Sequence, residues 1–296
     1  MNSGEISRRA FTGILGLGAF AQCAPAGSSP RTIPVGHTGI TWGNNSAQAI
    51  HDVSALGYYG FETFGDVLER WAGDPALDGL LAEAKLPLIS GYCSFNLTDS
   101  TKRAGELAKM KKWGGLIRKY GGSVSVLGPN GVDRANYNFE ASRTNIIETL
   151  NECGKMLTDE GLTPVLHQHT GTCIETRDEV YTVLDAADPR YVKFGPDIGQ
   201  LQKGGSDPVR VVKDYLPLVH HMHLKDYDGG PAYQGYCPLG RGKVNIPAIL
   251  DMVEKGQMRG RSMVELDPSR GMPVPAGETA AIAKSYLEKL GYQFRS

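Results

Sequence analysis

Histidine, aspartate and glutamate residues stand near the ends of four short apolar segments of this sequence. The segments are VLHQHTGT (165–172), FGPDIGQL (194–201), VHHMHLKDY (219–227) and SMVELDP (262–268). Ionisable groups are costly to bury without partners, so their recurrence at the ends of apolar runs indicates a shared ligand. Imidazole and carboxylate groups together suit Mn²⁺, Fe²⁺, Co²⁺ or Zn²⁺ better than Ca²⁺, and they leave coordination positions for substrate oxygens.

The alternation of side chains along a strand decides which of these groups can meet. Residues two apart share a face, so His167 points with His169, and His221 points with His223 and Lys225. Lys225 is expected near the rim of the fold, where its ammonium group binds a substrate oxygen or, with its pKa lowered by a nearby metal, takes part in proton transfer. A surface salt bridge is the alternative. The neighbouring Asp226 has the opposite orientation and is expected to pair locally or to cap the following loop.

Eight strand-like segments alternate with helix-like segments along most of the chain. Strands are predicted at 33–42, 59–65, 86–93, 123–128, 163–170, 191–199, 219–226 and 262–267, and helices at 46–56, 66–84, 101–120, 139–160, 175–187, 206–216, 245–256 and 277–290. Regular alternation implies parallel strands joined by crossover helices, and eight repeats close into a single (β/α)8 TIM barrel. Such barrels place their chemistry at the carboxyl ends of the strands, where Glu62 of the second strand and Asp197 of the sixth join the histidines.

Composition and charge favour one domain that acts on a small molecule. The 296 residues are 41% hydrophobic and 21% charged, with a formal net charge of -1. Lysine and arginine are scattered, without the basic stripe that a nucleic-acid-binding protein uses. We therefore expect one barrel over residues 32–296, a small-molecule ligand and no nucleic acid. QMRGRSM (257–263) and DPSRGMPVPAG (267–277) are interpreted as loops over the mouth or as contacts within a homo-oligomer.

Residues 1–31 have the pattern of an export signal followed by a linker. A pair of arginines at positions 8 and 9 precedes an apolar run that ends at Ala21 and is too short to span a bilayer. The order resembles a bacterial twin-arginine signal, which predicts a periplasmic protein without a membrane span. Cleavage after Ala21 is one expectation, a lipid anchor at Cys23 is another, and a frayed basic terminus is the alternative to both.

The four segments with which this section began, in their order, resemble the xylose isomerase-like barrel superfamily, often called sugar phosphate isomerases and epimerases. Within it the chain is similar to the inosose dehydratase branch, and GITWGNN (39–45) and PLGRGKVNIPAIL (238–250) resemble the same branch. The resemblance spans residues 33–294. It implies an enzyme that acts on a carbohydrate or polyol with one divalent metal ion, with manganese favoured over cobalt, iron, zinc or magnesium.

The resemblance also implies roles for individual residues. Members commonly hold their metal with an acid on strand five, aspartate on strand six, histidine on strand seven and glutamate on strand eight; the matching residues here are His167, Asp197, His223 and Glu265. The strand-five acid is thus replaced by a histidine, which points to the inosose dehydratase branch. Substrate contacts are expected from Glu62, Gln200, His221, Trp42 and Arg241. Gln200 stands where many relatives have a histidine, and His221 can instead orient a ligand or pack.

The predicted reaction begins with removal of a proton next to a carbonyl group, through an enediolate that the metal stabilises. His169 or Glu265 takes this proton, and His169 or Lys225 assists the leaving oxygen. The branch resemblance and the missing acid favour elimination from a keto-sugar, a cyclic keto-polyol or a 3-keto-glycoside. The alternatives are a sugar isomerase or epimerase on an unphosphorylated ketose, and a non-catalytic carbohydrate-binding barrel.

Overall fold

Eight parallel strands form the central sheet of the protein, whose structure, a computed structural model, describes residues 31–296. In sheet order they are β6 (Lys193–Phe194), β5 (Thr163–Leu166), β4 (Val124–Pro129), β3 (Leu88–Phe95), β2 (Phe61–Phe64), β1 (Val35–Thr38), β10 (Ser262–Val264) and β7 (Met222–Leu224). Two further backbone bridges, Phe194 to Val219 and Asp197 to His223, join the ends of this sheet. The predicted single (β/α)8 barrel is confirmed, whereas the predicted export signal falls on residues 1–30, outside the described residues.

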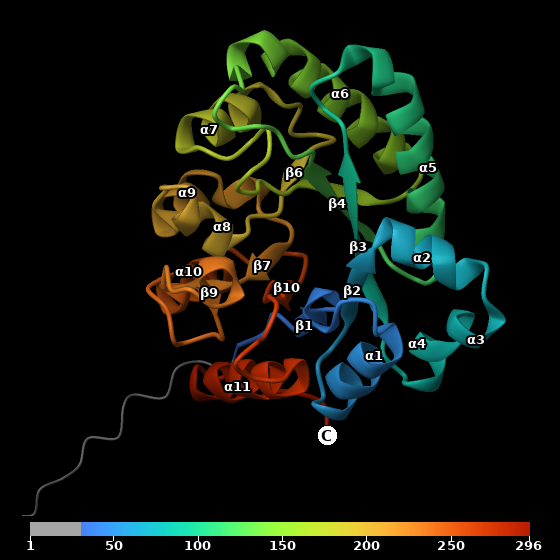
Figure 1. Ribbon diagram of the computed structural model, residues 1–296, viewed down its shortest axis with the longest axis vertical. Helices are drawn as coiled ribbons and strands as arrows, with labels where there is room; N and C mark the ends of the chain where they lie inside the picture. The colour runs from blue at the N-terminus through green and yellow to red at the C-terminus, as the bar shows by residue number, and fades with distance from the viewer. Residues whose placement is uncertain (1–30) are drawn as a thin grey trace, which may run out of the picture.

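Helices surround the strands on their outer side (Figure 1). They are α1 (Ser46–Ala55), α2 (Gly65–Ala72), α3 (Pro75–Asp78), α4 (Leu80–Glu83), α5 (Arg103–Lys119), α6 (Phe139–Asp159), α7 (Arg177–Ala186), α8 (Ile198–Lys203), α9 (Pro208–Asp214), α10 (Ile246–Lys255) and α11 (Ala276–Lys289). Apolar residues three or four positions apart face the strands, as in α10, which buries Ile246, Ile249, Leu250 and Val253. Polar caps fix where helices begin: the Asn245 side chain accepts a hydrogen bond from Ala248 N–H, and Thr176 forms a capping box with Glu179.

Three segments differ from the sequence prediction. The helix predicted at 66–84 is divided into α2, α3 and α4, because Pro75 and the glycines before and after it interrupt the helical period. The strand predicted at 191–199 ends at Phe194, and α8 begins at Ile198 within the same segment. A small hairpin of β8 (Asp226–Tyr227) and β9 (Tyr236–Cys237) follows β7.

The short strands leave the functional residues just beyond their carboxyl ends. His167 directly follows β5, Lys225 follows β7 and Glu265 follows β10. Residues 257–261 of QMRGRSM, in contrast, precede β10, and the two arginines of this segment line a hollow with Ser123 and Thr163 at the opposite end of the barrel. The expectation that this segment covers the mouth is therefore wrong, because the direction of β10 places it at the amino end of the strands.

Candidate active site

Asp197 owes its position to the start of α8. As the N-cap residue, it uses Oδ1 to accept hydrogen bonds of 2.9 Å from the backbone N–H groups of Gly199 and Gln200. The cap leaves the other oxygen, Oδ2, turned into the barrel, where it forms no hydrogen bond within residues 31–296 apart from its ion-pair contact with Lys225. Gly199 is needed here because a Cβ atom would lie 2.7 Å from the Lys225 side chain. The same turn therefore fixes both the carboxylate and the lysine beside it.

His167 presents an unprotonated nitrogen to this carboxylate. Its Nδ1 lies 3.2 Å from the carbonyl oxygen of Gly195, and since a carbonyl only accepts, Nδ1 carries the proton and Nε2 has a free lone pair. Burial, followed by the charge of neighbouring His223, holds the pKa of His167 well below its ordinary value, so the ring is neutral. Nε2 lies 4.0 Å from Asp197 Oδ2 and has no hydrogen-bond partner among residues 31–296.

The donors of His167, Asp197 and His223 fit a metal ion. One donor atom from each of the three buried residues lies within 4.8 Å of the others. The Lys225 ammonium group already contacts Asp197 Oδ2, but the lone pair of His167 Nε2 has no donor among residues 31–296, and nitrogen with carboxylate oxygen suits a transition-metal or zinc ion. Three of the four predicted ligands are thus brought together, and the fourth, Glu265, contacts His223.

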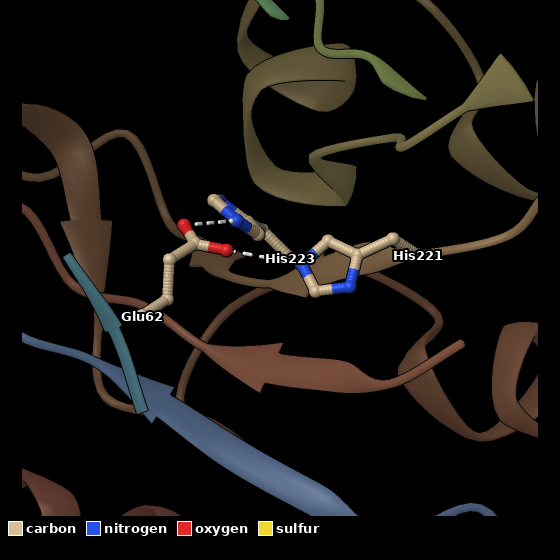
Figure 2. A group of neighbouring side chains, drawn as sticks. All are labelled: Glu62, His221 and His223. Carbon is tan, nitrogen blue, oxygen red and sulfur yellow. Dashed lines mark hydrogen bonds and ion pairs between the residues drawn. The ribbon is translucent and has the colours of Figure 1, made fainter. Parts of the chain in front are cut away.

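His223 lies between two glutamates, and Figure 2 shows its contact with one of them, Glu62. Its Nε2 is 2.9 Å from Glu62 Oε1, and its Nδ1 is 2.9 Å from Glu265 Oε2. Burial alone would lower the pKa of His223, but the charges of Glu265 and Glu62 outweigh it and raise the pKa well above its ordinary value. A neutral imidazole ring carries one N–H group and can donate to only one of the two carboxylates. With a metal bound at one ring nitrogen, the second nitrogen would carry the proton and donate it to a glutamate, an arrangement common at metal-binding histidines.

Glu62 and His221 form a deeper layer of the barrel. Glu62 is 1% exposed and accepts hydrogen bonds from Ser90 Oγ, at 2.5 Å, and from His221 Nε2, at 3.0 Å. The donor atoms of Glu62, His221 and His223 also lie within 4.8 Å of one another, so this cluster is a second candidate for a metal. The donor atoms of Glu62 and His221 already contact each other, whereas His167 Nε2 has no hydrogen-bond partner among residues 31–296, which favours the set that contains His167 and Asp197.

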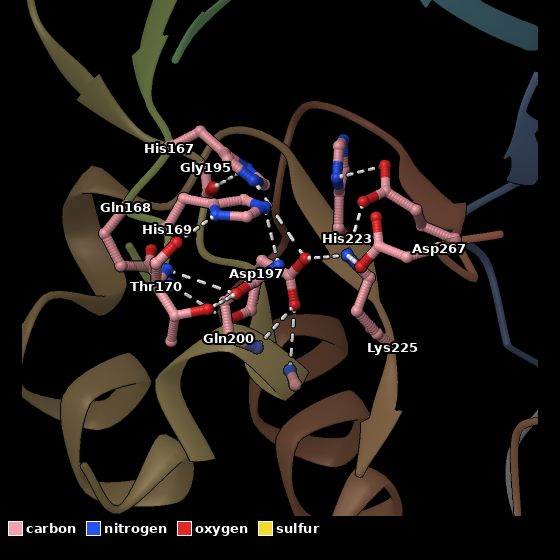
Figure 3. Close-up of polar contacts among 12 residues, drawn as sticks. His167, Gln168, His169, Thr170, Gly195, Asp197, Gln200, His223, Lys225 and Asp267 are labelled. Atoms are coloured by element: carbon pink, nitrogen blue, oxygen red, sulfur yellow. Dashed lines mark hydrogen bonds and ion pairs between the residues drawn. The ribbon is translucent and has the colours of Figure 1, made fainter. Parts of the chain in front are cut away.

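Lys225 is buried rather than near the rim (Figure 3). Its Nζ lies 2.6 Å from Glu265 Oε1 and 2.9 Å from carboxylate oxygens of both Asp197 and Asp267. Burial would lower the pKa of Lys225, but the three carboxylates raise it well above its ordinary value. The expectation of a rim position is wrong, because the residues after β7 continue into the β8–β9 hairpin, and Tyr236 of that hairpin covers the ammonium group, 4.8 Å from the ring centre.

A small cavity of about 80 Å³ opens beside these residues. Its polar wall is formed by Thr38, Glu62, His169, Glu265 and Asp267, and its apolar wall by Ile40, Phe64 and Tyr92. Tyr92 also packs edge-on against His167, with 5.3 Å between the ring centres. Two predicted catalytic residues, His169 and Glu265, therefore face the same space.

The five predicted substrate contacts have different surroundings in the structure. Glu62 lines the cavity, and His221 lies beneath it, 0% exposed. Gln200 is also buried, and both ends of its side-chain amide form hydrogen bonds with other residues of the protein. Trp42 donates its indole N–H to Asp52, and exposed Arg241 lies in a hollow against α11, so the structure does not support substrate contacts for these two.

Sequence reasoning assigned no role to several residues that line or support the cavity. Asp267 lies two residues beyond Glu265, so the alternation that selected Glu265 also points to it. Ser90 and Tyr92 share a face of β3, but neither has a side chain that singles it out in an apolar strand. Tyr236 lies on a hairpin without a sequence signal, and only the fold reveals its position.

Comparison with known proteins agrees with this geometry. A family model described as the xylose isomerase-like TIM barrel matches residues 50–290. The chain belongs to the xylose isomerase-like TIM barrel family. The inosose dehydratase of Clostridium botulinum is 24% identical in an alignment over 276 residues that covers 83% of this chain and 90% of the relative. The predicted family resemblance is therefore confirmed.

Two solved structures share the fold. A 3-keto-D-glucoside 4-epimerase from E. coli has a TM-score of 0.67 and 14% identity, with 88% of this chain and 99% of that chain covered. The IolI protein with a bound zinc atom has a TM-score of 0.72 and 15% identity, with 88% and 98% covered. Every helix in the described part of the xylose isomerase-like chain is too short or too polar to cross a membrane.

Proposed function

We propose that this chain is a divalent-metal-dependent enzyme that removes a proton next to the carbonyl group of a keto-sugar, a cyclic keto-polyol or a 3-keto-glycoside and then eliminates an oxygen substituent. The buried Nε2 of His167, which has no hydrogen-bond partner among residues 31–296 and lies 4.0 Å from Asp197 Oδ2, carries the proposal. The dehydratase name of the C. botulinum relative and the zinc atom bound by IolI support it.

His167, Asp197 and His223 would hold the metal, with Glu265 as the fourth ligand or as the partner of the His223 ring. When bound, the ion would supply Lewis-acid stabilisation of the negative charge that develops on the substrate oxygens. Manganese remains our preferred identity. Lys225 holds Asp197 and Glu265 in place from the opposite side, because its ammonium group contacts both carboxylates.

His169 is the proposed base, since it lines the cavity and its Nε2 carries a lone pair, which accepts a hydrogen bond from the Gln200 amide. Once this hydrogen bond is broken, the C–H bond next to the carbonyl gives its proton to Nε2, and the electron pair forms a C=C bond as the bond to the β-oxygen breaks. The same imidazole then returns the proton to the leaving oxygen. Phe64 and Tyr92 offer an apolar wall for the C–H face of the substrate. Lys225 does not line the cavity, which argues against the predicted role in assisting the leaving oxygen.

Epimerisation is the second candidate, because His169 and Glu265 reach the cavity from different strands. Two proton carriers can remove a proton from one side of a carbon and return another to the opposite side. In that case every atom of the carbon skeleton and its oxygen substituents is retained. Elimination instead releases water or an aglycone.

An NMR assay in D₂O separates these outcomes. The protein, supplied with Mn²⁺, is incubated with ketoses, cyclic keto-polyols and 3-keto-glycosides. We expect loss of the substituent β to the carbonyl and a new vinylic signal. The variant His169→Gln should be slower by about 10²-fold or more, because a positioned acid-base group contributes about 10²–10⁴ in rate. His51→Gln is the control, since the His51 side chain is 75% exposed on α1.

Two results would contradict the elimination reaction. Deuterium incorporation with inverted configuration and no released group would identify an epimerase. Tight binding of a sugar without turnover, with or without added metal, would identify a non-catalytic carbohydrate-binding barrel.

We also propose that residues 1–31 direct export to the periplasm. The proposal rests on the arginine pair followed by the short apolar run. A reporter fused to residues 1–31 should appear in the periplasm, and replacement of both arginines by lysine should retain it in the cytoplasm. A matched Cys23→Ala fusion tests the lipid anchor, because only an anchored reporter changes from the membrane to the soluble fraction.

A further inference from the structure

Gln200 is a buried amide at the third position of α8, and every polar contact of its side chain is internal. Its Oε1 accepts hydrogen bonds from Thr170 N–H, at 3.1 Å, and from Thr170 Oγ1, at 2.7 Å. Its Nε2 lies 2.7 Å from His169 Nε2. Gln200 is 1% exposed and absent from the cavity wall, so it acts through His169 (Figure 3).

The backbone of Thr170 decides which way the Gln200 amide points. A backbone N–H group only donates, so the amide atom that faces it must be the oxygen. The other end of the amide, the NH₂ group, then faces His169 Nε2 and must donate to it. Nε2 therefore carries a lone pair and no proton.

A second, independent contact leads to the same tautomer. His169 Nδ1 lies 2.7 Å from the carbonyl oxygen of Thr170, which only accepts. The proton of the neutral ring is therefore on Nδ1, and again Nε2 is the acceptor. Thr170 thus fixes both ends of the arrangement: its N–H orients the amide, and its C=O holds the imidazole proton.

We infer that Gln200 is a positioning residue that holds His169 in the Nδ1–H tautomer, so that Nε2 stays unprotonated while it accepts from the Gln200 amide. A histidine held in this way can take a proton at Nε2 once the amide hydrogen bond is broken, and Nε2 has no proton of its own to donate. Because α8 begins at the Asp197 cap, one helix start positions both a candidate metal ligand and the partner of the base. The inference deepens the proposed function and rests on it only for the catalytic consequence.

The test measures both the tautomer of His169 and the kinetics of the proposed reaction. Long-range ¹H–¹⁵N spectra recorded at a pH of about 8.5, where an ordinary histidine is neutral, should show a protonated Nδ1 and an unprotonated Nε2 for His169 in the wild-type protein. The variant Gln200→Glu keeps the length of the side chain but places a carboxylate oxygen, which only accepts, against Nε2. We expect Nε2 to become protonated and kcat to fall by about 10²-fold or more, with KM changed less than fivefold or so.

Gln202→Glu is the matched control, because Gln202 lies on the same helix, is partly exposed and contacts neither His169 nor Thr170 through its side chain. It should retain the wild-type tautomer and kcat. A protonated Nε2 in the wild-type protein would overturn the inference without any variant, and so would an unprotonated Nε2 in folded Gln200→Glu. The spectra do not depend on the reaction: the expected tautomer without turnover of any compound would leave the inference intact and reject the proposed function.

Discussion

The ammonium group of Lys225 is the buried cation that balances the carboxylates around the candidate metal ligands. Glu62, Asp197, Glu265 and Asp267 lie in one connected network, and Lys225 and His223 are the cations in contact with them. Removing one partner from such a network leaves charge buried without compensation, which is costly. Lys225 is therefore expected to stabilise the folded protein as well as to position the carboxylates of the site.

The variant Lys225→Met, in metal-free protein, should lower the free energy of unfolding by about 3–5 kcal/mol, because three carboxylates lose their shared cation. Lys203→Met is the control: Lys203 also lies over the Tyr236 ring but is only half-buried, and its loss should cost about 1 kcal/mol or less. Urea denaturation in the presence of a chelator measures both. Equal losses would show that the buried network does not stabilise the barrel.

Alternation along the strands correctly predicted which residues share a face, but it could not predict their depth. His167, Asp197 and His223 meet as expected from their strands. Lys225 was expected near the rim and is buried, since depth depends on the hairpin that covers it. Gln200 was expected to bind substrate and instead supports His169, a role that is visible only once the amide and the ring are placed in space.

At the scale of the elements, helix caps and loop anchors determine the shape of the mouth. Asp226, whose orientation predicted a local role, accepts hydrogen bonds from the backbone N–H groups of Tyr227, Gly240, Gly242 and Val244. One buried carboxylate therefore holds both ends of the loop that carries Tyr236. The sequence predicted the barrel strands because their β-branched runs are regular, and it missed the hairpin because four residues of short strand leave no such pattern.

Replacement of Asp226 by alanine should loosen the loop between β8 and α10. Hydrogen bonds to a charged group contribute about 1.5–3 kcal/mol each, so the loss of several should raise the open population at least about tenfold. Limited trypsin digestion measures the change, because opening of the loop speeds cleavage after Arg241 and Lys243. Mass spectrometry identifies the resulting fragments. Asp228→Ala is the matched variant, because Asp228 accepts one backbone N–H group, from Gly230. A cleavage rate for Asp226→Ala no higher than that of Asp228→Ala would refute the anchoring role.

At the scale of the whole molecule, barrel closure brings together groups that are distant in the chain. The bridge between Asp197 and His223 joins the segment after β6 to β7, and Glu62 contributes from β2. Eight regular repeats made this closure predictable from sequence. The choice between two overlapping donor sets was not predictable, because it depends on which donor atom already has a hydrogen-bond partner.

Metal content tests the central claim most directly. Elemental analysis of the wild-type protein after gel filtration should find about one equivalent of a divalent transition metal or zinc per chain. His167→Ala should lose it, whereas His221→Ala, which removes a ligand of the deeper cluster only, should retain it. Wild-type protein without metal, or His167→Ala with its metal intact, would contradict the proposed site at His167, Asp197 and His223.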